Sequence, residues 1–131
     1  MEFYATTDIP ISVTDLQQRL TISDLPRWCA SIDKVLSDAS TSGEIFCVWG
    51  TFRVNREEIR GGVRFSLPGC ANVLQWTVTT ELPPDPQQTV IHLTINRLEQ
   101  HPDFVETIQQ FVDDWKAGLE MHWREQGANP G

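Results

Sequence analysis

The C-terminal part of the chain has the most regular pattern of apolar positions. From Pro102 onward, apolar side chains recur every three or four residues, which is the spacing of one face of an α-helix. This stripe consists of Phe104, Ile108, Phe111, Val112, Trp115 and Leu119. Pro102 suits the first helical position, where its missing N–H costs little. The pattern predicts a helix of about 22 residues, roughly 33 Å long at about 1.5 Å per residue.

The rest of this helix is polar. Asp113, Asp114 and Glu120 fall outside the apolar stripe, so we expect them on the solvent face. Residues 126–131 follow the helix, and we expect them to form a disordered tail.

The middle of the chain alternates between apolar and polar residues, as half-buried β-strands do. Strands are expected at residues 44–54, 63–67, 74–82 and 90–96. Gly50 should bend the first of them, and Pro68-Gly69 is a turn dipeptide. Apolar residues occupy both faces of the first strand, so it needs cover on both sides at one end.

The N-terminal third predicts one strand and two short helices. Residues 2–12 are rich in apolar and β-branched side chains and should form the strand. Thr14 and Gln17 make a capping-box pattern for the first helix. Residues 23–36 have apolar positions at helical spacing and predict the second helix. The Ser-, Thr- and Gly-rich segment 37–43 is expected to be a loop.

Together these segments predict one α+β domain, residues 1–125, with the element order β-α-α-β-β-β-β-α. This order lacks the β-α-β alternation that would call for a parallel sheet. Strands joined by short turns pair antiparallel, so we expect a curved antiparallel sheet wrapped around the long C-terminal helix. Space left between the sheet and the helix is where a ligand would sit.

Length and charge narrow the function. The chain has 131 residues, enough for one hydrophobic core, and 18 acidic against 10 basic residues, a formal net charge of −8. Such a field repels polyanions, so we expect neither nucleic acid nor an anionic membrane as a partner. The apolar runs are far shorter than the roughly 20 residues of a membrane-spanning helix, and no basic segment precedes an apolar one at the N-terminus. We therefore expect a cytoplasmic protein.

Three stretches of the chain carry a family resemblance. They are Asp8-Ile9-Pro10 with Leu20-Thr21, Asp24-Leu25 and Arg27-Trp28; Gly50-Thr51-Phe52 with Arg64-Phe65; and Asp114 to Leu119. The first resembles the proline after strand one, the Leu-Thr-Asp turn and the Arg-Trp pair of the START-like helix-grip superfamily, also called SRPBCC. The second resembles the central hairpin of that superfamily, and the third resembles the Gly-Trp start of its last helix. The branch they most resemble is the group similar to activators of heat-shock-chaperone ATPase. Asp114 stands where the family has Gly, and the expected strands are one or two fewer than its usual complement.

The resemblance implies a hydrophobic cavity between the sheet and the last helix. Members of the superfamily include lipid carriers, polyketide cyclases and chaperone cofactors, so the fold does not determine the function. The ligand-binding residues expected there are Phe65, Trp76, Phe111 and Trp115. Trp28 and Trp49 are further candidates. The alternative is that all these rings are ordinary core residues, and both descriptions can hold, because core side chains bound a cavity of this kind.

No motif specific for nucleotide binding, a serine nucleophile or a zinc protease is present. We accordingly expect no catalytic residue, no metal and no cofactor. Cys29, Cys47 and Cys70 are odd in number and irregularly spaced, which favours reduced thiols, two of them in the core.

Scattered polar residues remain to be weighed. The histidines are His92, His101 and His122. They are far apart in sequence, which favours surface or cap positions over a shared metal site. Glu57-Glu58, beside Arg56 and Arg60, is either an acid/base pair at a pocket mouth or, as we expect, part of a solvated hairpin loop with mixed charges. Arg53 and Arg64 are either an anion site or, as we expect, exposed partners of Glu57 or Glu81.

These observations favour a non-enzymatic module that binds a small hydrophobic ligand between the sheet and the C-terminal helix. One alternative is a protein-interaction or chaperone-cofactor domain, because the surface is acidic and the resemblance points to a chaperone-related branch. A second alternative is a small cyclase- or dehydratase-like enzyme, which would require polar groups converging inside the cavity. The chain is expected to be a monomer or a homodimer.

Overall fold

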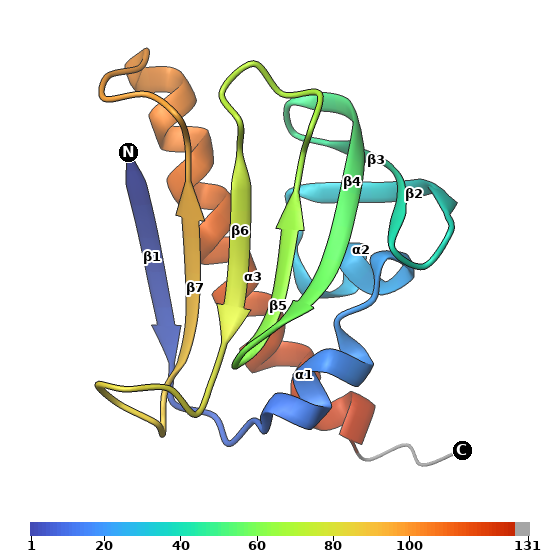
Figure 1. Ribbon diagram of the computed structural model, residues 1–131, viewed down its shortest axis with the longest axis vertical. Coiled ribbons are helices and arrows are strands. Elements are labelled where there is room, and N and C mark those ends of the chain that lie inside the picture. Colours follow the sequence, from blue (N-terminus) through green and yellow to red (C-terminus); the bar gives the residue numbers. More distant parts are fainter. Residues whose placement is uncertain (128–131) are drawn as a thin grey trace.

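The computed structural model describes residues 1–127 of the chain, which form one antiparallel sheet with a long helix across one face (Figure 1). The strands are β1 (Glu2–Thr7), β2 (Ile32–Asp38), β3 (Ser42–Cys47), β4 (Gly50–Ile59), β5 (Gly62–Ser66), β6 (Gln75–Thr79) and β7 (Thr89–Thr94). They lie in the order β1-β7-β6-β5-β4-β3-β2. The first strand therefore closes one edge of the sheet by pairing with the last.

Residues 1–127 also contain three helices and one short 3-10 turn. They are α1 (Val13–Arg19), the 3-10 turn η1 (Ile22–Asp24), α2 (Leu25–Trp28) and α3 (Pro102–Gly127). Helix α3 runs behind the sheet in Figure 1, and α1 and α2 lie near its C-terminal end. The expected fold class, a curved antiparallel sheet around a long C-terminal helix, is confirmed.

Two segments differ from the sequence prediction. The structure ends the second helix at Trp28 and turns the chain into strand β2, where the sequence predicted helix to residue 36. The β2–β3 register shifts between Ile32 and Lys34 and again between Val35 and Ser37. Each shift adds an unpaired residue to the strand, which breaks the alternation of apolar and polar positions. The resulting spacing imitates a helix.

The predicted strand 44–54 is a hairpin of two strands. The chain reverses at Val48-Trp49, so that Cys47 and Gly50 are register partners. Gly50 has φ +113°, a backbone conformation that only glycine adopts without strain. The apolar residues of segment 44–54 fell on both faces of the predicted strand because they belong to two antiparallel strands. This hairpin and strand β2 together give the sheet two more strands than the sequence predicted.

The core lies between the inner face of the sheet and α3. One inward row crosses four strands, since Phe65 is the register partner of Trp76, Trp76 of Leu93, and Leu93 of Phe3. Helix α3 covers this row with Ile108, Phe111, Val112, Trp115, Leu119 and Trp123, all buried. The apolar stripe predicted for the helix is its buried face.

Two of the acids expected on the solvent face of α3 also attach the helix to its neighbours. Asp113 and Glu120 are exposed as expected, and Asp114 is half-buried. Glu120 accepts a hydrogen bond of 2.7 Å from the hydroxyl of Thr7 at the end of β1. Asp114 accepts one of 2.5 Å from Ser31, just before β2. These bonds link α3 to residues more than 80 positions away in sequence.

The C-terminal end of α3 is held by Arg19 from α1. The Arg19 guanidinium carbon lies 3.6 Å from the ring centre of Trp123 and 5.4 Å from that of Trp28. The same side chain donates a 2.6 Å hydrogen bond to the Trp123 carbonyl oxygen. A cation against aromatic rings is stabilising, so Arg19 joins α1 to α2, which contains Trp28, and to α3, which contains Trp123.

The termini of the predicted elements also shift. Ser12, rather than Thr14, caps α1 by accepting a 3.1 Å hydrogen bond from the Asp15 amide. Helix α3 continues through residues 126 and 127, which the sequence prediction placed in the tail, and residues 128–131 of that tail lie outside the described part of the chain. Within residues 1–127 no helix is long and apolar enough to cross a membrane.

Gly118 provides a direct test of how closely α3 packs on α2. A Cβ at this position would overlap the carbonyl oxygen of Trp28 and would lie 2.6 Å from its carbonyl carbon. Gly118→Ala should therefore reduce the free energy of unfolding by about 1–3 kcal/mol, the usual cost of overpacking, although alanine favours a helix by about 1 kcal/mol over glycine. Urea unfolding measures the change.

The matched control is Gly69→Ala. Nothing lies within 4 Å of a Cβ built on Gly69, so this variant should unfold at nearly the wild-type urea concentration. A Gly118→Ala protein that is more stable than the wild type would show that α3 does not press against the α2 backbone.

Candidate ligand-binding site

The four residues expected to bind a ligand meet in the interior. Phe65 and Trp76 come from neighbouring strands β5 and β6, and their ring centroids lie 5.3 Å apart. Phe111 and Trp115 come from the buried face of α3. Trp76 lies 4.9 Å from Phe111 and 6.4 Å from Trp115, and Phe65 lies 6.1 Å from Trp115. We call these four residues the aromatic cluster.

The aromatic cluster is closed to solvent. None of its four side chains is more than 1% exposed. Ring centroids 5–6 Å apart correspond to rings in contact. The space that the sequence analysis expected as a cavity is thus occupied, at these four residues, by the side chains themselves.

Two polar atoms in the aromatic cluster have no hydrogen-bond partner. The indole nitrogens Nε1 of Trp76 and Trp115 are buried and unpaired within the described structure. Other tryptophans are satisfied: Trp28 Nε1 donates to the Arg19 carbonyl oxygen at 3.3 Å, and Trp49 Nε1 to the Thr107 hydroxyl at 2.9 Å. A buried donor without a partner costs about 1–3 kcal/mol. Two in one cluster therefore call for an explanation.

Trp49 connects the aromatic cluster to the surface. It lies in the β3–β4 turn and is half-buried, with its ring 4.9 Å from Phe111 and 6.0 Å from Phe104 at the start of α3. The sequence analysis named Trp49 as a candidate but gave it no place relative to the other rings. Its position became clear only with the β3–β4 hairpin, because a single bent strand would have put it elsewhere.

The interior around the aromatic cluster is electrically neutral. Among the described residues the buried polar side chains are Thr7, Thr80 and Thr89, with no charged residue among them. Arg56 reaches inward from β4, but it donates to the carbonyl oxygens of Leu20 at 2.6 Å and Gln17 at 2.5 Å. The sequence analysis placed Arg56 in a mixed-charge loop, whereas it fastens α1 to the sheet.

Two of the three cysteine thiols lie in the core. Cys29 and Cys47 are buried, as expected for two of the three, and Cys70 is half-buried. Burial raises the pKa of the Cys29 thiol far above its usual value, and burial likewise raises the pKa of Cys47. A thiol that stays protonated is a poor nucleophile, so these two cysteines serve packing.

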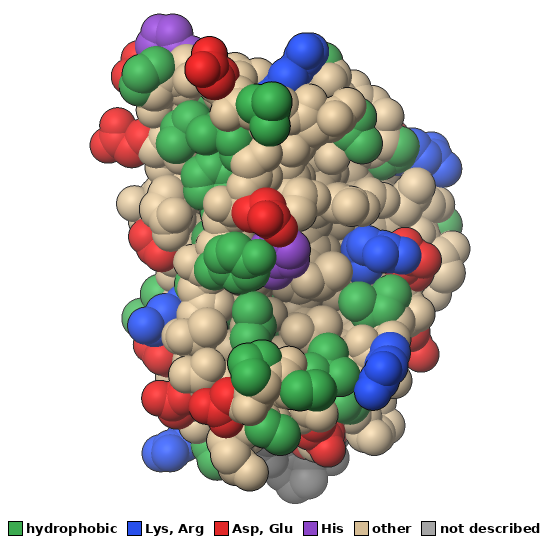
Figure 2. Space-filling model, turned by 60° about the vertical axis from the view of Figure 1, so that its left-hand side comes forward, with side chains coloured by type: hydrophobic (Ala, Val, Ile, Leu, Met, Phe, Trp, Pro, Cys, Tyr) green, Lys and Arg blue, Asp and Glu red, His purple; other side chains and the backbone are tan. Residues whose placement is uncertain are grey.

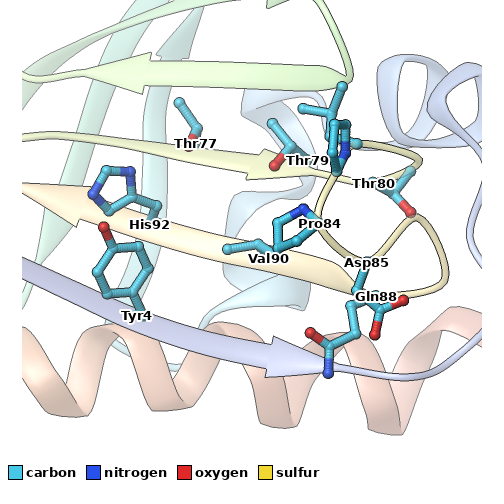
Figure 3. Close-up of a pocket in the computed structure, with 11 residues that line it drawn as sticks. Tyr4, Thr77, Thr79, Thr80, Pro84, Asp85, Gln88, Val90 and His92 are labelled. Carbon is cyan, nitrogen blue, oxygen red and sulfur yellow. The ribbon is translucent and has the colours of Figure 1, made fainter.

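The outer face of the sheet carries a separate hollow of about 300 Å³ over β1, β7 and β6. Tyr4 and His92 are register partners there, and their rings stack with centroids 4.4 Å apart (Figure 3). The Glu2 carboxylate lies 2.9 Å from His92 Nε2 and accepts a 3.3 Å bond from the Tyr4 hydroxyl. The residues of the 80–88 connection form one side of the hollow. Because Tyr4 and Glu2 are exposed, water can satisfy these groups, unlike the indoles of the interior.

The histidines occupy three separate sites. His92 pairs with Glu2, His122 with Glu125 at 2.9 Å, and His101 lies 3.8 Å from Asp103. In the described part of the chain no three His, Cys, Asp or Glu side chains gather as metal ligands would.

Glu57 and Glu58 belong to strand β4, not to the hairpin loop expected for them. Glu57 faces Arg64 across the sheet, and its carboxylate accepts a 2.7 Å bond from Arg64 Nε, which is the pairing the sequence analysis expected. This bond lowers the pKa of Glu57 and raises that of Arg64. Arg53 lies opposite Glu44 in the β3–β4 register.

Acidic side chains are spread over the visible surface without forming one patch (Figure 2).

Comparison with known proteins identifies the fold. No protein-family model and no curated sequence matches the chain. Among solved structures, XoxI from Bacillus cereus superposes with a TM-score of 0.67 at 12% identity, over 96% of this chain and 97% of that chain. An uncharacterised protein from Bacillus thuringiensis gives 0.62 at 12% identity, over 91% and 96% of the two chains. A START superfamily protein from Mycobacterium smegmatis gives 0.63 at 10% identity, over 95% and 98%.

Identities this low show the fold and nothing finer. The likeness spans nearly the whole of each chain, with the sheet and the C-terminal helix included. It does not distinguish between branches of the superfamily, so the resemblance to the heat-shock-chaperone activators stays a prediction. The chain has the START-like helix-grip fold.

Proposed function

We propose that this protein is a non-enzymatic module that binds a small hydrophobic ligand between the inner face of the sheet and α3. The observation that carries the proposal is the aromatic cluster, which joins strands β5 and β6 to α3 and contains two buried donors without partners. The rings touch one another in the free protein, so an apolar molecule would enter by separating them and would take their place against the apolar core. The START-like fold supports the proposal by analogy.

The ligand enters at the β3–β4 turn. Trp49 lies on this turn beside Phe111 and Phe104, and it is half-buried whereas Phe111 is buried. The turn is short and ends at Gly50, whose positive φ is a backbone conformation that glycine adopts without strain. Displacing Trp49 exposes Phe111, and Phe111 contacts Trp76. Trp49 is the lid of the site.

Ligand binding should raise the melting temperature of the purified protein. A molecule that binds only the folded state adds about 2.7 kcal/mol of stability when present at 100 times its dissociation constant. Thermal unfolding with separate fatty acids, sterols and aromatic polyketides should show a rise with at least one of these classes. No rise with any of them would contradict the proposed function.

The route of binding is tested with the lid. Trp49→Ala should increase the association rate of a ligand found in that panel several-fold, because the cover over Phe111 is removed. Met121→Ala is the control: Met121 is an exposed residue of α3, 66% accessible, and its loss should leave the rate unchanged. Stopped-flow tryptophan fluorescence gives both rates. Equal rates in the two variants would place the entrance elsewhere.

A second candidate function is protein interaction through the β2–β3 end of the sheet. Leu36, Phe46 and Val48 are 49%, 41% and 53% exposed at this edge. Strand β2 is the last strand of the sheet, and an edge strand presents unpaired backbone groups to a partner. The partner proposed is a second copy of this chain.

Self-association should depend on Phe46. If two copies dock at this edge, the purified protein should sediment as a dimer at high concentration, and Phe46→Glu should return it to a monomer by burying a charge in the contact. Leu98→Glu, at a residue 93% exposed in the β7–α3 connection, is the control and should not change the sedimentation coefficient. A wild-type monomer at every concentration would eliminate this candidate.

A further inference from the structure

The unpartnered donors of the aromatic cluster specify the chemistry of what binds there. We propose that the ligand carries one uncharged hydrogen-bond acceptor, such as a ketone or ester carbonyl oxygen, which accepts from the indole nitrogens of Trp76 and Trp115. This inference rests on the proposed function, because it names the class of molecule that the same site takes. The two nitrogens are buried and have no partner within residues 1–127.

The polar group of the ligand must be an acceptor. An indole N–H can only donate, so a donor on the ligand would add to the unpaired groups instead of satisfying them. The other buried unpaired side-chain atoms in the described chain are the hydroxyl of Thr89 and Nε of Arg19. Neither belongs to the cluster of Phe65, Trp76, Phe111 and Trp115. The unpaired atoms of the aromatic cluster are therefore both hydrogen-bond donors.

One acceptor atom is able to serve both indoles. The Trp76 and Trp115 rings, one from the sheet and one from α3, lie 6.4 Å apart between centroids and are tilted by 54° to each other. A carbonyl oxygen has two lone pairs and accepts two hydrogen bonds. Under this proposal, an oxygen of a ligand inserted between the strand and the helix accepts from both nitrogens, and the apolar body of the ligand lies against Phe65 and Phe111.

The acceptor must be uncharged. A buried carboxylate needs a cationic partner or a full set of donors to offset its desolvation. No charged side chain is buried in the described chain, and the two half-buried arginines nearest the core are already bonded to backbone carbonyl oxygens. Two indole donors alone do not replace the hydration of an anion. Free carboxylic acids in their ionised form should therefore bind weakly.

Matched naphthalene probes test this specificity by calorimetric titration. 2-Acetylnaphthalene offers a neutral carbonyl acceptor, 2-ethylnaphthalene has the same shape without one, and 2-naphthoate has a charged one. The acetyl compound should bind at least about tenfold more tightly than the ethyl compound, since a satisfied buried donor is worth about that factor. The naphthoate should bind more weakly than the acetyl compound.

Variants assign the preference to the two indoles. Trp76→Phe and Trp115→Phe each remove one donor and keep an aromatic ring, so each should reduce the ratio between acetyl and ethyl affinities while the ethyl compound still binds. Trp123→Phe is the control, because Trp123 packs against Trp28 near the C-terminal end of α3, outside the aromatic cluster, and its ratio should equal the wild-type ratio. Two separate donor variants keep the test valid if one of them fails to fold.

The outcomes separate the inference from the function on which it rests. Equal affinity for the acetyl and ethyl compounds, or tightest binding of the naphthoate, would overturn the inference and leave a hydrophobic ligand site in place. Binding of none of the probes would overturn the inference and count against the proposed function as well. An acetyl preference that survives in both donor variants would also overturn the inference.

Discussion

Everything in this structure depends on the packing of α3 along the inner face of the sheet. The helix comes so close to α2 that Gly118 has no room for a side chain beside the Trp28 carbonyl. Its buried residues cover the inward row that runs from Phe3 to Phe65 across four strands. Hydrogen bonds from Thr7 and Ser31 fix its position along the sheet. Because the helix is fixed in this way, Phe111 and Trp115 necessarily face Phe65 and Trp76.

The sequence was sufficient to predict the fold class and the membership of the aromatic cluster. The stripe of α3 and the alternation of β5, β6 and β7 are long, regular signals, and residues that point to one core must meet. The pattern failed where local irregularity changed its period. Bulges in β2 gave a strand the spacing of a helix, and a two-residue reversal at Val48-Trp49 hid a hairpin within an apparently continuous strand.

The sequence also did not predict the polar contacts between segments that are distant along the chain. Arg56 was expected in a solvated loop, yet it bonds the carbonyl oxygens that end α1. Glu120 is exposed as expected and Asp114 is half-buried, but each also bonds a hydroxyl from a distant segment, which the sequence did not predict. Periodicity reports which face a residue occupies, but it does not report which backbone groups will lie opposite. The unpaired indoles of Trp76 and Trp115 have no sequence signal for the same reason.

Those two indoles are the place where packing alone does not account for the interior. A core built only for stability would pair such donors or replace tryptophan by phenylalanine, because a buried unsatisfied group is costly. Sites where local rules are broken are where function is expected.

The most direct test is a ¹⁵N–¹H correlation spectrum of the tryptophan indoles in the free protein, assigned by single Trp→Phe variants. Trp76 and Trp115 should give resonances typical of indoles without a hydrogen bond, upfield of Trp28 and Trp49, and should move downfield when 2-acetylnaphthalene is added. Resonances of all four indoles at hydrogen-bonded positions in the free protein would contradict this account.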